Sequence, residues 1–350
     1  MSITTQLTHS QEAWKYLKGV VCLYKPPGYS LSSIVGILRQ KMVQDLNCME
    51  RFSEQSVDES HLLSDSDSTV LLENNSSELI NLEPSSSAVV SSSGEIRDYS
   101  SHPSVLGPGY SFSDMSHKKV NQLGFKVSGL SLVGLNDVGV ARARTLVKSR
   151  LISTFQVRGE FGRATRTGWS DGKTAKCSGY KHLAAKTHSL EQLLVNISSA
   201  HQARSWSVAQ VGLDTQEAYH MACEGPPRPK LLSETLIYNM KLRELELPHF
   251  MLEVQCVVGD NDQEQTQLVR LIEELGIKCR TVACVHSIRC AALGPWTTDQ
   301  SLLVKQINLQ TVLNNMSVNR KLYKEFIARR QPHRPNIVKK KSKNKVESNL

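Results

Sequence analysis

The chain has 350 residues, of which 39% are hydrophobic, and a formal net charge of +9. This length allows a sizeable core, in one large domain or two small ones. No window approaches the roughly 18 consecutive apolar residues of a membrane span. The first 19 residues lack the apolar centre of a secretory signal and contain no arginine, so they are a weak candidate for a mitochondrial targeting segment.

The charge is distributed unevenly. Residues 48–99 contain 11 acidic and 2 basic residues, a local charge of −9. The rest of the chain contains 40 basic and 22 acidic residues, which gives it a charge of +18. A folded part this basic commonly meets a polyanion, most often nucleic acid, and a generically basic, solvated surface is the alternative.

Two segments have the composition of disordered chain. Residues 48–101 are rich in serine and acids and predict an insert, either a tolerated surface insertion or a phosphorylated segment that competes for a basic groove. Residues 329–350 are basic and poor in apolar residues. They predict a plain solvated tail, an RNA contact or a nuclear signal.

The first predicted elements surround the insert. Val20–Tyr24 predicts a strand, the KPPG run ends it, and a helix follows with a serine at position 30, 32 or 33 as its cap. After the insert, Ser128–Leu135 predicts a buried strand. Asn136 or Asp137 can cap a helix that runs to Arg150.

The second half of the chain repeats the alternation. Predicted strands are Phe155–Glu160, Phe250–Val258 and Thr281–Ala292, and predicted helices are Leu190–Ala200, Thr215–Glu224 and Gln265–Gly276. In the last helix the apolar residues share one face and Gly276 is placed as the residue after the C-terminus. This order predicts an α+β domain with a mixed, largely antiparallel sheet flanked by helices.

Eight cysteines are present, and none forms a C-x-x-C pair. The spacing of Cys279, Cys284 and Cys290 fits no common zinc site. Several cysteines lie in apolar, strand-like runs, so we expect reduced core cysteines and no bound metal.

Six segments, in the same order, resemble the TruB family of pseudouridine synthases and, within it, the mitochondrial branch. They are LYKPPG at Leu23–Gly28, HPSVLGPGY at His102–Tyr110, SGLSLVGLN at Ser128–Asn136, FQVRGEFGRATRTGWSDG at Phe155–Gly172, DTQEAYHMACEG at Asp214–Gly225, and FMLEVQCVVGDNDQEQTQLVRLIEELG at Phe250–Gly276 followed by HSIRC. The resemblance implies a pseudouridine synthase fold that acts on RNA and needs no cofactor.

The resemblance also implies a domain organisation. Residues 20–47 and 102–300 would form one synthase domain, interrupted by the insert at 48–101. Residues 1–19 would precede it, residues 301–328 would add a helical extension, and residues 329–350 would form the tail. Bacterial members carry a C-terminal RNA-binding PUA module, which the mitochondrial branch lacks, and we expect none here.

The family's chemistry depends on one aspartate in a loop of the form L-D-x-x-A-S/T-G, which acts on a uridine flipped out of the RNA stack. This chain reads LGFKVSG, with Gly124 at the aspartate position. Glycine has no side chain and cannot act as nucleophile, acid or base. The family's arginine partner corresponds to Val269, and the adjacent Arg270 should point elsewhere, about 100° around the helix.

Other carboxylates lie near this loop in the sequence. Asp114, in an irregular segment, is retained as a substitute catalytic carboxylate. Asp137 is better explained as a helix cap. Asp171 matches an aspartate that the resemblance marks as structural.

An RNA groove should remain. Phe155 corresponds to the family's active-site tyrosine and keeps a face on which a base can stack, although a core strand aromatic is the alternative. Basic residues near it can neutralise phosphates. The predicted RNA-binding residues are Lys25, Phe155, Arg158, Arg163, Arg166, Trp169 and Lys173.

These features predict an RNA-binding homologue in mitochondrial RNA metabolism that has lost the isomerisation chemistry and has an RNA chaperone or assembly role. One alternative is an active synthase that converts uridine in mitochondrial mRNA, tRNA or rRNA with a displaced carboxylate. Another is a protein-interaction scaffold in mitochondrial ribosome assembly. RNA-processing or ribosome-assembly proteins are expected partners. The resemblance implies the mitochondrial matrix, and the basic tail keeps the nucleus as an alternative.

Overall fold

The computed structural model describes residues 9–49, 109–184, 187–212, 214–223, 225, 227, 234–262 and 264–330. Four expectations fall wholly or largely outside these residues: the first part of the N-terminal segment, the acidic insert, most of the HPSVLGPGY segment and the basic tail. In the described part, no helix combines the length and apolar character that crossing a membrane requires.

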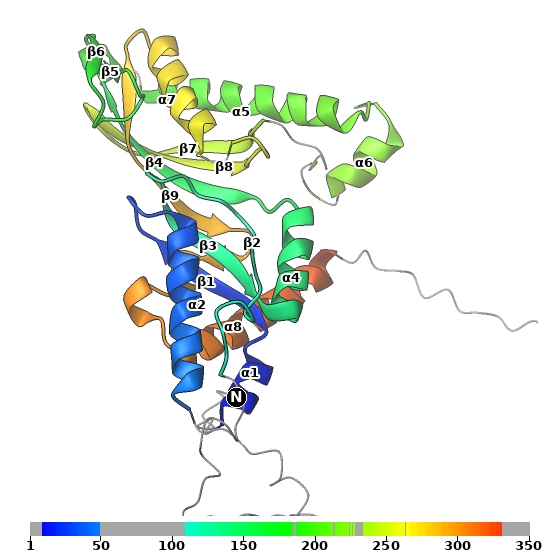
Figure 1. The fold of residues 1–350 in the computed structure, drawn as a ribbon. Coiled ribbons are helices and arrows are strands. Elements are labelled where there is room, and N and C mark those ends of the chain that lie inside the picture. The colour runs from blue at the N-terminus through cyan, green and yellow to red at the C-terminus, as the bar shows by residue number, and fades with distance from the viewer. Residues whose placement is uncertain are drawn as a thin grey trace, which may run out of the picture.

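One twisted sheet of eight strands runs through the molecule (Figure 1). Its main order is β1-β3-β9-β4-β8-β7, with β2 beside β3 and β10 beside β9. The β3–β9 pair is parallel and the other pairs are antiparallel, so the predicted α+β class with a largely antiparallel sheet is confirmed. The strands are β1 Gly19–Lys25, β2 His117–Lys119, β3 Ser128–Leu135, β4 Ser153–Phe161, β7 Leu236–Glu246, β8 His249–Val257, β9 Ala283–Leu293 and β10 Trp296–Thr297. A separate small sheet pairs β5 (Arg163–Thr165) with β6 (Thr174–Cys177).

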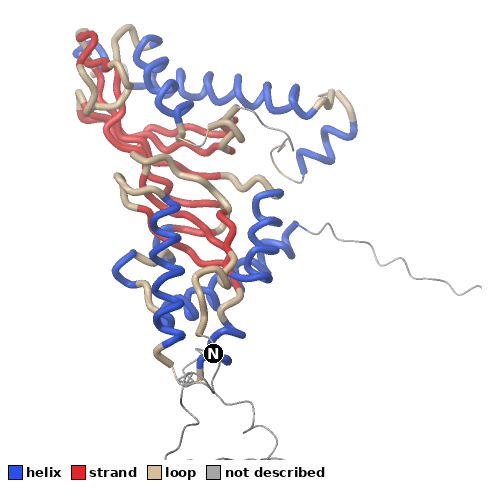
Figure 2. Tube along the Cα trace, viewed as in Figure 1, coloured by secondary structure: helices blue, strands red, loops and turns tan. Residues whose placement is uncertain are grey.

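Helices flank both ends of the main sheet (Figures 1 and 2). They are α1 Ser10–Tyr16, α2 Leu31–Asn47, α4 Asn136–Lys148, α5 Thr187–Ala209, α6 Gln216–Cys223, α7 Thr266–Lys278 and α8 Leu309–Arg330, with short 3-10 turns at Lys181–Leu183, Thr298–Gln300 and Val304–Gln306. At one end of the sheet α5 packs on β7 and α7 packs on β9, whereas α2, α4 and α8 surround the β1 and β3 end.

Strand β1 divides the core into two apolar clusters. Val20 and Cys22 pack in the larger cluster, which also contains side chains of β4, β8, β9, α5 and α7. Val21 and Leu23 pack in the smaller cluster with side chains of α1, α2 and α8. Because successive strand residues point to opposite faces, both faces of this end of the sheet are covered.

Helix α8 protects the free edge of β1. Asn315 accepts a hydrogen bond from the Cys22 N–H (2.9 Å), and the Asn319 amide donates to the Val20 carbonyl (3.1 Å). The Tyr24 N–H donates to the Leu302 carbonyl at 2.9 Å. These bonds satisfy backbone groups that an unpaired edge would expose. Residues 302–319 are therefore packed into the fold.

Two predicted helix ends differ from the observed ones. Helix α7 runs past Gly276 to Lys278, and a Cβ on Gly276 would lie 2.6 Å from the Ala283 backbone nitrogen. This glycine therefore allows α7 to approach β9 and is not the terminating residue. At α4 no side chain caps the start, because the Asn136 amide donates instead to the Leu17 carbonyl at 2.7 Å.

Candidate functional site

The loop between β2 and β3 is fixed by Lys25. The Lys25 ammonium donates to the carbonyls of Val127 (2.6 Å), Phe125 (3.2 Å) and Pro26 (3.3 Å). Its side chain is fully buried, and burial lowers its pKa to about 8, while Glu264 acts in the opposite direction. The structure therefore places this ammonium inside the protein, where it holds the loop, and not at the surface expected for a phosphate contact.

Gly124 is buried in this loop and faces the segment that leads into α7. Its N–H donates to Oε1 of Gln265 at 2.8 Å, and the Phe125 N–H donates to Oε2 of Glu264 at 2.9 Å. The Gln265 amide also donates to the Gln122 carbonyl at 3.1 Å. A Cβ on Gly124 would lie 2.5 Å from Oε2 of Glu264 and 2.8 Å from the Glu264 carbonyl oxygen. Glu264 thus fills the space that a side chain at position 124 would need.

Val269, the residue predicted to correspond to the family's arginine, is packed in the core. Val269 is 5% exposed and belongs to the larger core cluster. A Cβ on Gly168, whose φ is +74°, would clash with the Val269 side chain. Arg270 is exposed to solvent, as the helical rotation predicts.

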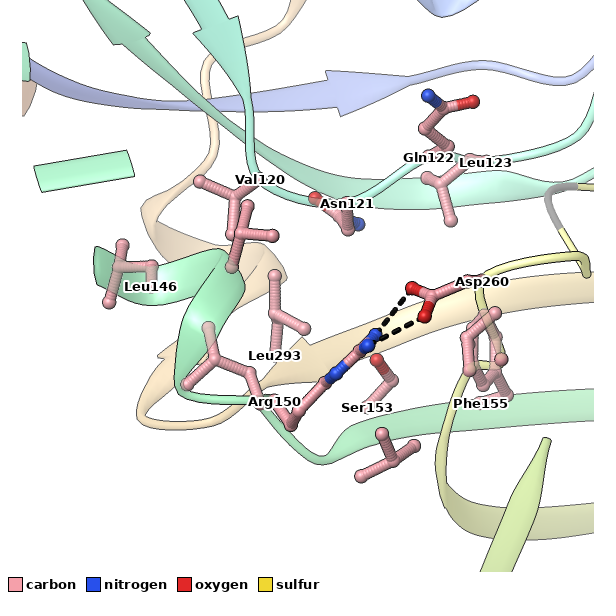
Figure 3. Close-up of a pocket in the computed structure, with 15 residues that line it drawn as sticks. Val120, Asn121, Gln122, Leu123, Leu146, Arg150, Ser153, Phe155, Asp260 and Leu293 are labelled. Carbon is pink, nitrogen blue, oxygen red and sulfur yellow. Dashed lines mark hydrogen bonds and ion pairs between the residues drawn. The ribbon is translucent and has the colours of Figure 1, made fainter. Parts of the chain in front are cut away.

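A cavity of about 240 Å³ lies beside this loop (Figure 3). Asn121, Gln122 and Leu123 line it from the loop, and Phe155 lines it from β4. Phe155 is 1% exposed and is part of the larger core cluster. Phe155 is therefore packed as a core aromatic, which was the alternative prediction. It also forms part of the cavity wall.

An ion pair crosses the same cavity. The Arg150 guanidinium donates to both carboxylate oxygens of Asp260, each at 2.6 Å (Figure 3). The Asp260 hydrogen bond raises the pKa of Arg150. Bidentate pairs of this kind fix geometry as well as charge. The pair joins the turn after α4 to the loop after β8.

The aromatic side chain of Trp169 lies close to Lys126 of the Gly124 loop. Its own loop is bound to β9, because the Ser170 N–H donates to the Val285 carbonyl at 2.8 Å. The Lys126 ammonium lies 5.5 Å from the Trp169 ring centroid and forms a 2.6 Å ion pair with Asp171. This ion pair lowers the pKa of Asp171. Asp171 thus contacts the Gly124 loop through Lys126.

The predicted basic residues do not all share one surface. Arg158 is exposed on β4, but it is three residues from the buried Phe155 and points to the opposite face of the strand. It lines a second cavity, of about 410 Å³, with His249 and His286. Arg163 donates to Glu160 at 3.0 Å. Exposed Arg166 and Lys173 lie together at the β5–β6 hairpin, where the Arg166 N–H donates to the Lys173 carbonyl.

The substitute carboxylate Asp114 lies at the wrong end of β3. It accepts from the Ser111 N–H at 2.7 Å in an exposed turn. The backbone just after it meets the C-terminal end of β3, since the Asn136 N–H donates to the Ser116 carbonyl at 2.9 Å. Gly124 precedes the N-terminal end of the same strand. An eight-residue strand is roughly 25 Å long, so Asp114 is not placed to replace an aspartate at position 124.

The sequence reasoning missed Glu264 and Gln265, and it also missed Lys126 and Arg289. The first two belong to a polar run, DNDQEQ, that carries no motif of its own. Arg289 pairs across the sheet with Ser128 and lies 5.8 Å from the ring centroid of Tyr24, so it adds an exposed cation close to the Gly124 loop.

Four of the cysteines are buried, three are exposed and Cys279 is half-buried. Burial strongly raises the pKa of Cys22 and Cys256 and raises that of Cys290 to about 12. Cys284 is buried too, so the prediction of core cysteines is confirmed for four of the eight. Among the described residues, no three histidine, cysteine, aspartate or glutamate side chains are grouped to hold a metal ion.

The relatives found by sequence comparison share one protein name. No family profile matches the chain. The mitochondrial pseudouridylate synthase TRUB2 of Xenopus tropicalis is 27% identical over 303 residues, which are 85% of this chain and 84% of the relative. TRUB2 of Homo sapiens is 30% identical over 220 residues, 62% of this chain and 63% of the relative. TRUB2 of Rattus norvegicus is 26% identical over 296 residues, with 85% and 84% covered.

Among solved structures, the archaeal box H/ACA sRNP Nop10–Cbf5 complex matches with a TM-score of 0.41 and 11% identity, over 91% of this chain and 60% of that chain. A Cbf5–Nop10–Gar1 complex matches with a TM-score of 0.39 and 11% identity, over 87% and 59%. The sequence relatives are those that the six motifs predict. Over most of its length the chain is similar to the mitochondrial pseudouridylate synthases named TRUB2, in agreement with its resemblance to the TruB family.

Proposed function

We propose that this protein binds RNA in mitochondria and does not carry out the family's uridine isomerisation. The observation that carries the proposal is the Gly124 position, which has no side chain and whose side-chain space is filled by Glu264. Removing the nucleophile from such a site typically costs several powers of ten in rate. An RNA chaperone or assembly role would remain, and the relatives named mitochondrial pseudouridylate synthases support both the RNA ligand and the compartment.

The surface near the Gly124 loop supports RNA binding. Lys126 and Arg289 are exposed cations, and each lies near an aromatic ring, that of Trp169 or Tyr24. Cations neutralise phosphates, and aromatic faces stack on bases of a single strand.

The test has two measurements on the purified protein and a pool of mitochondrial RNA and tRNA. The first is pseudouridine formation, with human TRUB2 as the active comparison. The second is RNA affinity as a function of salt. We expect no conversion and an affinity that falls steeply with salt. Robust conversion by the wild type would contradict the loss of chemistry, and salt-independent affinity equal to that of a neutral protein would favour the scaffold alternative.

One observation favours an active synthase as the second candidate. Glu264 presents a carboxylate oxygen at the position of a residue-124 side chain, and the Phe125 N–H orients it. The displaced carboxylate would then be Glu264 and not Asp114. In that case Glu264→Gln would abolish conversion and leave RNA affinity unchanged.

A further inference from the structure

The space beside Gly124 is closed by backbone as well as by a side chain. A Cβ at position 124 would meet the Glu264 carbonyl oxygen at 2.8 Å and the Glu264 Cα at 2.9 Å. A flexible side chain can rotate away from a ligand, but main-chain atoms move only if the whole segment moves. The obstruction at position 124 is therefore part of the fold of the loop before α7.

Gln265 locks this loop onto the Gly124 loop. Its fully buried side chain accepts from the Gly124 N–H and donates to the Gln122 carbonyl, so one amide binds both sides of position 124. We call the two residues Glu264 and Gln265 the clamp. If the clamp opened, the Gly124 N–H, the Gln122 carbonyl and the Gln265 amide would lose these hydrogen bonds, which is costly for buried groups.

Asp262 holds the clamp in place. This aspartate is 5% exposed, accepts from the Thr235 hydroxyl at 2.7 Å and from the Gln267 N–H at 3.2 Å, and its carbonyl accepts from the Gln265 N–H at 3.3 Å. Gln265 has a left-handed backbone, with φ 54°. A strained residue of this kind persists where surrounding contacts determine its conformation.

We infer that the clamp shuts the nucleoside subsite, so that RNA bound by this protein keeps its uridines within the strand. The inference rests on the proposed RNA binding. A reacting sugar carbon would have to come within about 3–3.5 Å of a group at position 124. The Glu264 carbonyl oxygen and Cα already lie 2.8 and 2.9 Å from a Cβ at that position, closer than the reacting carbon would have to come. The clamp is thus a specificity determinant: it selects RNA by its backbone and its accessible bases and rejects a flipped nucleotide.

The first test is amide hydrogen exchange at Gly124 and Phe125 in the free protein. The informative variant is Gln265→Gly, which tolerates the left-handed backbone and removes the clamping amide. We expect slow exchange in the wild type and at least about tenfold faster exchange in the variant, as loss of a net hydrogen bond predicts. Glu274→Ala, which removes an exposed carboxylate from α7, is the matched control and should change nothing. Rapid exchange in the wild type, or no effect of Gln265→Gly, would overturn the inference.

The second test reports on the bound RNA. A single-stranded RNA carries 2-aminopurine next to a uridine, and its fluorescence rises when the neighbouring nucleotide leaves the stack. We expect wild-type protein to bind without this rise, Glu264→Ala with Gln265→Gly to produce it, and Glu274→Ala to behave as wild type. A rise with the wild type, or wild-type conversion of uridine that Glu264→Gln removes, would overturn the inference. If no RNA binds at all, the proposed function fails, and the exchange experiment alone still decides whether the clamp exists.

Discussion

The Arg150 guanidinium binds both carboxylate oxygens of Asp260 at 2.6 Å and so connects the turn after α4 to the loop after β8. Arg150 has a left-handed backbone, with φ 48°. Its side chain is 17% exposed and that of Asp260 is 55% exposed. The pair crosses the cavity beside Phe155, so it holds together two segments that approach the Gly124 loop from opposite halves of the sequence.

Removing one partner of this pair should lower stability moderately. We expect Asp260→Asn to reduce the free energy of unfolding by about 1 kcal/mol, because the half-exposed carboxylate is screened by solvent. Arg150→Ala should cost more than Arg150→Gly, since glycine adopts φ 48° without the penalty that alanine meets. Urea unfolding of the three variants measures this, and an alanine variant as stable as the glycine variant would contradict it.

Lys25 should make the protein more stable as pH rises. Burial lowers its pKa in the folded protein from 10.5 to about 8. Between these two values the unfolded chain binds a proton that the folded protein has released, so the free energy of unfolding increases with pH in that window. The free energy of unfolding of the wild type, relative to that of Lys25→Met, should rise by roughly 2–3 kcal/mol between about pH 8 and pH 10.5.

The comparison must be between the two proteins and not within one, because a change of pH acts on the whole chain. Parallel stability curves for wild type and Lys25→Met would show that the ammonium keeps its ordinary pKa. Met is similar in volume to the lysine stem, so Lys25→Met keeps the packing while it removes the charge.

Lys126 and Asp171 should have opposite effects on RNA affinity. Lys126→Ala should weaken binding across sequences and reduce the slope of log affinity against log salt by about one. Asp171→Asn removes the carboxylate that pairs with Lys126 and should strengthen binding. Fluorescence anisotropy with a single-stranded RNA measures both. Lys278→Ala, an exposed α7 lysine paired with Glu274, is the control; an equal effect of Lys278→Ala would mean that net charge alone governs binding.

Thiol reactivity should separate the cysteines. Cys48, Cys177 and Cys223 are exposed and should react rapidly with a chromogenic disulfide reagent. Cys22, Cys256 and Cys290 are buried, and their raised pKa keeps them as thiols, so they should react only at the rate of unfolding. Rapid native reaction of more than four thiols would show that the sheet centre is open to solvent.

The sheet was predictable because its strands carry period-two or continuous apolar patterns. Phe250–Val258 and Thr281–Ala292 differ from β8 and β9 by at most two residues at each end. The apolar face of α7 was also correct, with Leu268, Leu271 and Leu275 buried. Strand β7 was missed, because its outer half, from Lys241 onward, is polar and mostly exposed.

The site was only partly predictable. Counting residues within a motif identified Gly124 and Val269, because each lies at a fixed distance from a recognisable glycine in its own segment. Nothing local shows that Glu264 folds against Gly124, since the two are 140 residues apart and meet only through tertiary structure. Burial of Lys25 was equally hidden, because a lysine in a Pro-Gly turn normally faces solvent.

Placing aspartate and arginine at positions 124 and 269, where the motif spacing predicts them, should not produce the family's chemistry. Gly124→Asp must displace the Glu264 main chain and should cost about 2 kcal/mol or more of stability. Val269→Arg buries a charge against Gly168 and should cost about 3 kcal/mol or more. If the two side chains could pair, the double variant would be more stable than the sum of the single costs, by the coupling of a buried ion pair.

The clamp predicts that they cannot pair, because the Glu264 main chain lies where the aspartate would begin. The costs in the double variant should therefore add, and pseudouridine formation should stay at the wild-type level. Urea unfolding and conversion of a uridine-containing RNA measure the two outcomes. Strong coupling together with new activity would show that the loop before α7 yields readily, and that two substitutions alone separate this protein from an active synthase.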